Sequence, residues 1–175
     1  WTPYGDIRNV TFDTVAMDRM YRGVHASLSP GQVCEKLQFK NFQISNMFAI
    51  KKPGGSAPYA QGVYISQPGD NGFQGDCRFD TGWFDHNGWL PEGEVPWTEV
   101  AWNRCHHVYP APGGKAFSYY NCCFFRAAMN AFRGLPEGNT IDTAVFVGNG
   151  SCGGGRDATW RNCVAFTDES GDLSH

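Results

Sequence analysis

The chain has 175 residues, of which 41% are hydrophobic, and a formal net charge of −3 from 14 basic and 17 acidic residues. This composition excludes a disordered chain and allows a single domain, residues 1–175, with a buried core. There is neither a basic patch nor an apolar run of about 20 residues, so the sequence predicts no nucleic-acid partner and no membrane partner.

Residues 1–30 contain no cysteine and are interpreted as an N-terminal extension. Residues 10–12 have the composition of a short strand. Met17, Met20 and Val24, in contrast, have helical spacing, so a strand and a helical turn remain alternatives for this segment.

The clearest strand begins after Lys36. Leu37 and Phe39 alternate with polar residues, and Phe42 and Ile44 alternate in a shifted phase. The phase slips at residues 40–41, which predicts a β-bulge inside the strand. Residues 62–66 predict another strand, and residues 67–95 are interpreted as an aromatic-rich loop insert.

The second half of the chain predicts a hairpin, a short helix and two strands. Residues 99–109 and 115–125 flank a loop with the chemistry of a hairpin turn. Phe125, Met129 and Phe132 have the spacing of a short helix. Residues 140–147 and 160–166 read as strands, and no internal repeat is recognised. The expected fold is mainly β: an antiparallel β-sandwich or β-barrel, braced by disulfides, with one or two short helices.

Cysteine usage points to an oxidising compartment. No two of the seven cysteines have the CxxC spacing of a zinc or redox motif, so we expect disulfides and no metal. Sequons at Asn9 and Asn149 also predict a secreted, glycosylated, extracellular protein. Because the number of cysteines is odd, at least one thiol stays unpaired within the chain. The protein could therefore be a monomer, or a homodimer linked by a disulfide through that cysteine. The candidate disulfide residues are Cys34, Cys77, Cys105, Cys122, Cys123, Cys152 and Cys163.

One stretch of the chain is rich in tryptophan and is the candidate ligand-binding site. Exposed aromatic rings stack on the C–H faces of sugars, and neighbouring polar groups bind hydroxyls. The alternative is that these rings fill the core. The residues proposed for binding are Trp83, Trp89, Trp97, Asp80, Asp85 and His86.

A hydrolytic site is the other chemical possibility. The carboxylates Asp80, Asp85, Glu92 and Glu94 could include an acid–base pair, and a single histidine could serve as a general base with Glu99 or Asp80. Acids on solvated turns explain the same pattern. His106 and His107 are adjacent on a predicted strand and face opposite sides, so they do not share a metal. No catalytic residue, metal or cofactor is assigned.

Three features resemble the small secreted cysteine-rich proteins of filamentous fungi, a class that includes β-barrel allergens and plant-infection effectors. They are residues 42–44 after an early cysteine, residues 102–105, and the strand 140–147 followed by Cys152. The resemblance spans residues 34–166. It implies a non-enzymatic interaction protein, an effector or elicitor acting on a host protein or a cell-wall polysaccharide. A carbohydrate-binding protein and a small extracellular hydrolase are the second and third hypotheses.

Overall fold

The computed structural model describes the protein at residues 5–48, 61–66, 74–85, 106–109, 115–125, 130–132, 138–148 and 158–166. These residues form strands and turns, and none of them is helical. The strands are β1 (Ile7–Arg8), β2 (Thr11–Asp18), β3 (Arg22–Ser27), β4 (Cys34–Glu35), β5 (Gln38–Ser45), β6 (Gln61–Ser66), β7 (Gln74–Asp85), β8 (His106–Tyr109), β9 (Lys115–Phe125), β10 (Asn130–Phe132), β11 (Thr140–Val147), β12 (Thr159–Arg161) and β13 (Val164–Phe166).

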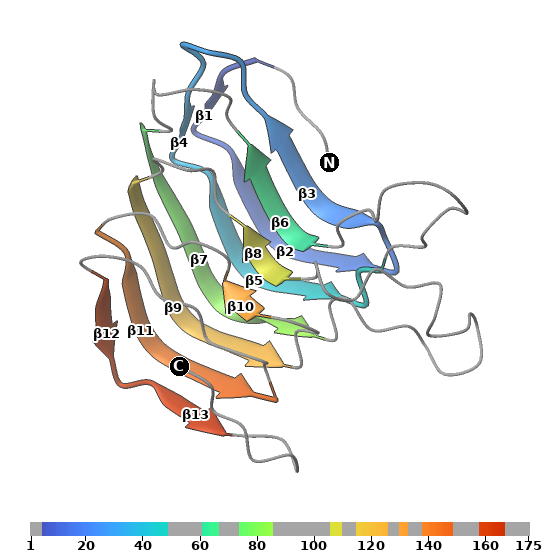
Figure 1. Ribbon diagram of the computed structural model, residues 1–175, viewed down its shortest axis with the longest axis vertical. Helices are drawn as coiled ribbons and strands as arrows, with labels where there is room; N and C mark the ends of the chain where they lie inside the picture. Colours follow the sequence, from blue (N-terminus) through green and yellow to red (C-terminus); the bar gives the residue numbers. More distant parts are fainter. Residues whose placement is uncertain are drawn as a thin grey trace.

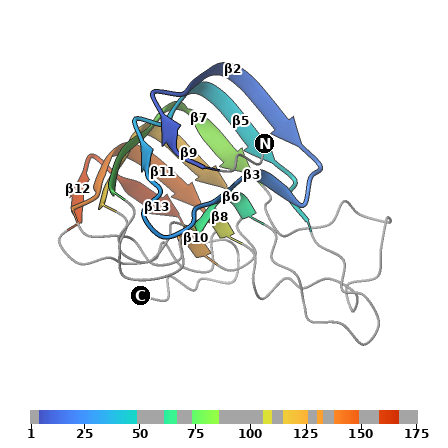
Figure 2. The ribbon, with the colours of Figure 1, turned by 90° about the horizontal axis from the view of Figure 1, so that it is seen from above.

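The strands form two main stacks (Figures 1 and 2). The large sheet has the order β12-β11-β9-β7-β5-β2, with β13 also beside β11. The small sheet has the order β10-β8-β6-β3, and β1 pairs with β4. Neighbours in each stack come from successive passes of the chain, which is the architecture of a parallel β-helix. Each complete turn of the chain around the solenoid is called a coil below.

Every strand pairing among the described residues is parallel, so the expected antiparallel sandwich or barrel is wrong. The predicted hairpin is also wrong, because β8 pairs with β6 and β10 while β9 pairs with β7 and β11 in the other sheet. Alternating hydrophobicity reports the two faces of a strand and not the direction of its neighbours.

The helical alternative near the N-terminus is replaced by two strands. Met17 is buried on β2 and Val24 on β3, whereas Met20 is exposed at the corner between them. The apolar residues therefore have helical spacing because a corner interrupts the alternation. Residues 5–27 belong to the first coil, and β7 occupies residues 74–85 of the stretch read as a loop insert. Phe125 ends β9 and Phe132 ends β10, while Met129 lies outside the described residues.

The phase slip at residues 40–41 is confirmed, but the β-bulge predicted there is wrong. On both sides of Asn41, β5 pairs with β2 and β7 one residue to one, and the cause of the slip is a corner. Asn41 has φ 49°, in the left-handed region, so Lys40 and Asn41 both face outward before Phe42 returns to the core. The same conformation recurs at the matching position of every coil, so the register continues past it. These six corner residues are Thr14, Asn41, Thr81, Asn121, Thr143 and Asn162, with φ between 49° and 55°.

Aromatic side chains stack inside the solenoid in the direction of the coils. Phe39, Phe79 and Tyr119 are completely buried, with successive ring centroids 5.1 Å apart. Phe84, Phe124 and Phe146 form a second column, with successive ring centroids 5.2 and 4.8 Å apart. Parallel in-register strands place equivalent residues about 4.8 Å apart, which is also a favourable separation for offset rings. The fold therefore depends on the same residue type recurring at the same place in each coil.

The described cysteines are thiols, so the expected disulfide bracing is not found among them. Cys34 and Cys77 are fully buried, and Cys122 occupies the same inward column as Phe42 and Ala144. A buried cysteine packs as a small apolar side chain, which explains its place in this core without a bridge. The remaining two, at positions 105 and 152, lie outside the described residues.

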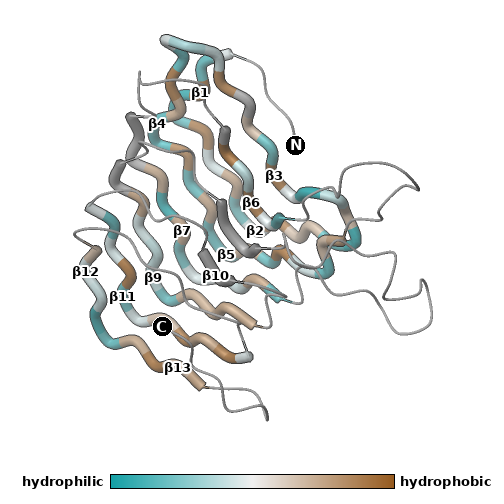
Figure 3. The backbone as a smooth tube through the Cα atoms, viewed as in Figure 1, coloured by the Kyte–Doolittle hydropathy of each residue, from teal (hydrophilic) through white to brown (hydrophobic). Residues whose placement is uncertain are grey.

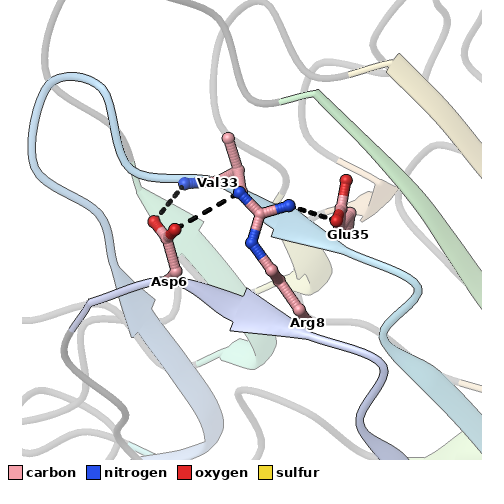
Figure 4. Close-up of polar contacts among 4 residues, drawn as sticks. All are labelled: Asp6, Arg8, Val33 and Glu35. Atoms are coloured by element: carbon pink, nitrogen blue, oxygen red, sulfur yellow. Dashed lines mark hydrogen bonds and ion pairs between the residues drawn. The ribbon is translucent and has the colours of Figure 1, made fainter.

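A polar cluster joins the first two coils where β1 meets β4 (Figure 4). Arg8 forms ion pairs with Asp6, at 3.3 Å, and with Glu35. The other Asp6 carboxylate oxygen accepts a hydrogen bond from the Val33 amide at 3.0 Å. Because the charged side chains are about half exposed, the cluster contributes little stability beyond fixing this corner.

Truncation of the central ring, Phe79→Ala, is expected to lower the free energy of unfolding by about 3–5 kcal/mol, because it leaves a cavity between two stacked rings. Phe166→Ala serves as the control, because this phenylalanine is 55% exposed. Its free energy of unfolding is expected to differ from that of the wild type by less than about 0.5 kcal/mol. Urea denaturation of both variants tests this. Equal effects would contradict the stacked-core interpretation.

Candidate functional site

The candidate site is a groove of about 450 Å³ on the outside of the large sheet, at the corner that all coils share. It crosses β2, β5, β7 and β9, so it runs along the stack and spans about 14 Å, three inter-strand spacings. The lining residues are Thr14, Val15, Ala16, Asn41, Phe42, Gln43, Thr81, Gly82, Trp83, Asn121 and Cys123.

Two columns of side chains give the groove its chemistry. The corner residues, exposed to solvent, form one wall of alternating hydroxyl and amide groups. The second column is Ala16, Gln43, Trp83 and Cys123, which are in register on neighbouring strands. The floor between the columns is Val15, Phe42 and Gly82. A shallow apolar floor with a few ordered polar groups is the usual composition of a site for a polar organic ligand.

Gly82 is required by the packing beneath the groove. A Cβ atom built at this residue would lie 2.5 Å from both the ring and the carbonyl oxygen of Phe42. The Phe42 ring therefore occupies the space that any side chain at residue 82 would need. The next residue, Trp83, is 44% exposed, so its indole is available to a ligand in the groove.

Asp80 borders the groove and is held by several donors. Arg78 donates to its carboxylate at 2.7 Å and Thr81 at 3.0 Å, and Asn121 on the next coil also donates. Burial alone would raise the pKa of Asp80, but the hydrogen bonds from Arg78, Thr81 and Asn121 outweigh it and lower the pKa. The carboxylate is therefore held in its ionised form, and its hydrogen bonds connect the corner residues Thr81 and Asn121.

The two adjacent cysteines face opposite sides of β9. Cys122 points into the core, and burial raises the pKa of its thiol well above the ordinary value, which makes it unreactive. Cys123 lines the groove, and partial burial raises its pKa as well. The groove therefore contains one accessible thiol, which can report on what occupies it.

The groove lining carries no charged side chain, and the described residues contain no group of three or more His, Cys, Asp or Glu side chains that could hold a metal ion. Within the same residues, no helix has the length and hydrophobicity of a membrane span. An uncharged lining favours neutral ligands over phosphate-bearing or acidic ones, because nothing in it would balance their charge.

The structure places only some of the candidate residues in one site. Trp83 lies in the groove and Asp80 at its border, whereas Asp85 is at the far end of β7, where its carbonyl accepts from the Asn46 amide. His106 is in β8, on the other sheet. The candidates Trp89, Trp97, His86 and Glu92 lie outside the described residues, as does Asn149. Asn9 is exposed in the turn before β2.

Sequence reasoning missed the corner residues, although a signal was present. Six eight-residue segments align on the corner: residues 11–18, 38–45, 78–85, 118–125, 140–147 and 159–166. Each has an aromatic residue or isoleucine at its second position and threonine or asparagine at its fourth. The segments are unequally spaced in the chain, so no fixed period drew attention to this internal repeat.

A second cluster on the small sheet was also not anticipated. The Arg22 guanidinium lies 4.5 Å from the ring centroid of Tyr64 and 4.6 Å from that of Tyr21, and it donates to Gln61 at 2.8 Å. Burial and the charge of Arg22 lower the pKa of the neighbouring His25. Because Arg22 already stacks and donates within the protein, this cluster connects neighbouring coils rather than presenting a vacant site.

Comparisons of the chain with models of protein families, with curated proteins and with solved structures find no match in any of the three.

Replacing Asp80 by asparagine is expected to lower the free energy of unfolding by about 1 kcal/mol at pH 7, because charge-assisted hydrogen bonds are lost. The pKa of Asp80 is lowered by folding, so its contribution is complete above the unfolded value of about 3.9 and is lost as the pH falls through the folded pKa. The difference between wild type and variant should therefore shrink below about pH 4 in urea titrations. A difference independent of pH would contradict this.

Proposed function

We propose that this protein is a non-catalytic, extracellular binding protein whose groove holds a neutral polysaccharide. The observation that carries the proposal is the exposed indole of Trp83, in register with Gln43 and beside the corner amide groups of Asn41 and Asn121. An indole face packs on the C–H face of a sugar ring, and amides and hydroxyls exchange hydrogen bonds with its hydroxyl groups.

The periodicity of the groove supports a chain-like ligand. Neighbouring groups of its polar wall are about 4.8 Å apart, a spacing comparable to one sugar of an extended chain. Hydroxyl and amide groups alternate along the wall, so equivalent groups recur in every second coil and would meet equivalent hydroxyls of every second sugar. The backbone of these groups is already ordered by strand pairing, so the protein would lose little conformational entropy when the ligand binds.

The absence of charge in the lining selects among polysaccharides. Acidic chains would bring carboxylates to a lining that has no cation to balance them, because the bordering cations, Lys40 and Arg78, already lie beside Asp13 and Asp80. Neutral chains need no such cation. We therefore infer that β-glucan-like or chitin-like chains fit better than uronic-acid polymers.

Trp83→Ala is expected to reduce retention on insoluble neutral polysaccharides at least about tenfold, because stacking of this size contributes more than 1 kcal/mol. The control is Trp160→Ala, since Trp160 is similarly exposed, at 40%, but lies on the last coil away from the groove. Far-ultraviolet circular dichroism verifies the fold of both variants. Cys123 alkylation, followed by mass spectrometry, should slow when the wild-type protein holds the ligand.

The outcomes of the binding experiment are distinct. Equal retention of the two variants, or alkylation of Cys123 that a ligand leaves unchanged, would place binding elsewhere on the molecule. Release of soluble sugars would identify an enzyme. Failure to bind any polysaccharide would favour a host protein partner, the second candidate. That candidate is supported by Met20 and Tyr21, which are exposed beside Arg22, because Met, Tyr and Arg are enriched in protein interfaces.

The extracellular location is tested at the first sequon. Asn9 is exposed, and Thr11, the third residue of the sequon, is exposed too. Protein isolated from its source is expected to lose mass at Asn9 on enzymatic deglycosylation, and Asn9→Gln to abolish the shift. A consistently unmodified Asn9 would remove this support for secretion.

A further inference from the structure

The corner wall of the groove offers hydrogen-bond acceptors to a ligand. Thr14 donates its single hydroxyl hydrogen to Asp13 at 3.2 Å, and Asn41 on the next coil donates to the same carboxylate at 2.9 Å. Asp80 accepts in the same way from the corner residues of the next two coils. A threonine hydroxyl that has donated its hydrogen can only accept, and an asparagine amide keeps its carbonyl oxygen as an acceptor. The wall therefore suits a ligand that donates, as the hydroxyl groups of a sugar do.

The acceptors of this wall alternate between two types, so the wall repeats every two coils. Thr14 and Thr81 provide hydroxyl oxygens on short side chains, whereas Asn41 and Asn121 provide amide groups that reach one bond further. Neighbouring strands are about 4.8 Å apart, so equivalent groups recur about every 9.6 Å. A chain that matches the wall must run straight along the stack and present the same edge at every second unit.

We propose that the groove binds a straight, β-1,4-linked glycan chain of the kind found in cellulose and chitin; this inference rests on the polysaccharide site proposed above. In such a chain each sugar is turned over relative to the one before it. One side of the chain therefore shows alternately the edge with the ring hydroxyl or acetamido groups and the edge with the hydroxymethyl group. Every second sugar would place the same edge against a threonine, and the sugars between would place the other edge against an asparagine. Chains with β-1,3 or α-1,4 linkages coil instead, so they would leave a straight groove.

The floor of the groove accepts a sugar in either orientation. Trp83 is 44% exposed, and beside it Gly82 presents no side chain, because the Phe42 ring occupies the space that one would need. The ring substituents of these β-1,4-linked sugars all project from the edges, so both faces of every sugar carry C–H groups alone. A sugar that is turned over can therefore still pack on the indole and on the apolar floor.

The length of the groove matches about four sugars. It crosses four strands, and its lining ends, within the described residues, at Asn121 and Cys123 of β9. The next outward residues in the register of Trp83 are Val145 and Val164. Hydrophobic residues also gather along β9, β11 and β13 (Figure 3). One sugar for each strand of the groove gives a tetrasaccharide as the matched probe.

Isothermal titration calorimetry with four tetrasaccharides tests the linkage. The probes are cellotetraose and N-acetylated chitotetraose, which are β-1,4-linked, laminaritetraose, which is β-1,3-linked, and maltotetraose, which is α-1,4-linked. At least one of the β-1,4 probes is expected to bind at least about tenfold more tightly than the other two linkages, because only these chains keep the hydrogen bonds of all four coils. The two β-1,4 probes distinguish a hydroxyl from an acetamido substituent.

The possible failures of this experiment are distinguishable. Equal or tighter binding of the β-1,3 or α-1,4 probe that is lost in Trp83→Ala would overturn the linkage and leave the proposed polysaccharide groove in place. Retention on insoluble polysaccharides without binding of either β-1,4 probe would also overturn the linkage alone. Neither retention nor binding of any probe would remove the proposed function together with this inference.

The role of the alternation is tested by making neighbouring corner residues alike. Asn41→Thr is expected to weaken binding of the β-1,4 probe about twofold to tenfold, the effect of one lost hydrogen bond. Asn162→Thr is the matched control, because Asn162 has the same backbone conformation and donates to Asp142 at 3.0 Å, but lies outside the groove lining. Equal affinities of the two variants would contradict the proposal. Circular dichroism verifies folding, and Asn121→Thr, at the other asparagine of the groove, replaces Asn41→Thr if that variant does not fold.

Discussion

The constraint on which this structure depends is that parallel strands in register must turn the same corner at the same place. At this corner, a residue of left-handed conformation makes two successive side chains face outward, and the inward columns on either side remain aligned. Threonine is costly in this conformation and asparagine less so. The aspartate beside each threonine compensates, since it accepts from that threonine and from the asparagine of the next coil.

The same corner produces the candidate site. Because the chain bends there, the outward columns on its two sides form the walls of a groove, and the residue between them forms the floor. Phe42 fills the space below Gly82, which leaves a surface without a side chain next to Trp83. The groove thus results from stacking corners that share one backbone conformation. The outward side chains that line it can differ from coil to coil without changing this backbone.

Local patterns predicted strands well where one face is buried. The alternation of Phe39, Phe42 and Ile44, with its slip at Asn41, marked β5 and its corner, and the β-branched run at residues 140–147 marked β11. The same patterns failed for the hairpin predicted from residues 99–109 and 115–125, because alternation carries no information on whether a neighbour is parallel. Of the candidate site, Trp83 and Asp80 were identified, but their partners on β5 and β9 are 40 residues away in each direction.

The sequence by itself determined that the chain is mainly β, that it is rich in aromatic residues, and that Trp83 stands among polar residues, because these depend on residue type and on local alternation. The tertiary structure decided the parallel direction of the strands, the burial of Cys34, Cys77 and Cys122 as thiols, and the gathering of the corner residues into one groove. Those features arise from contacts between successive coils, which lie about 4.8 Å apart in space but many residues apart in the chain.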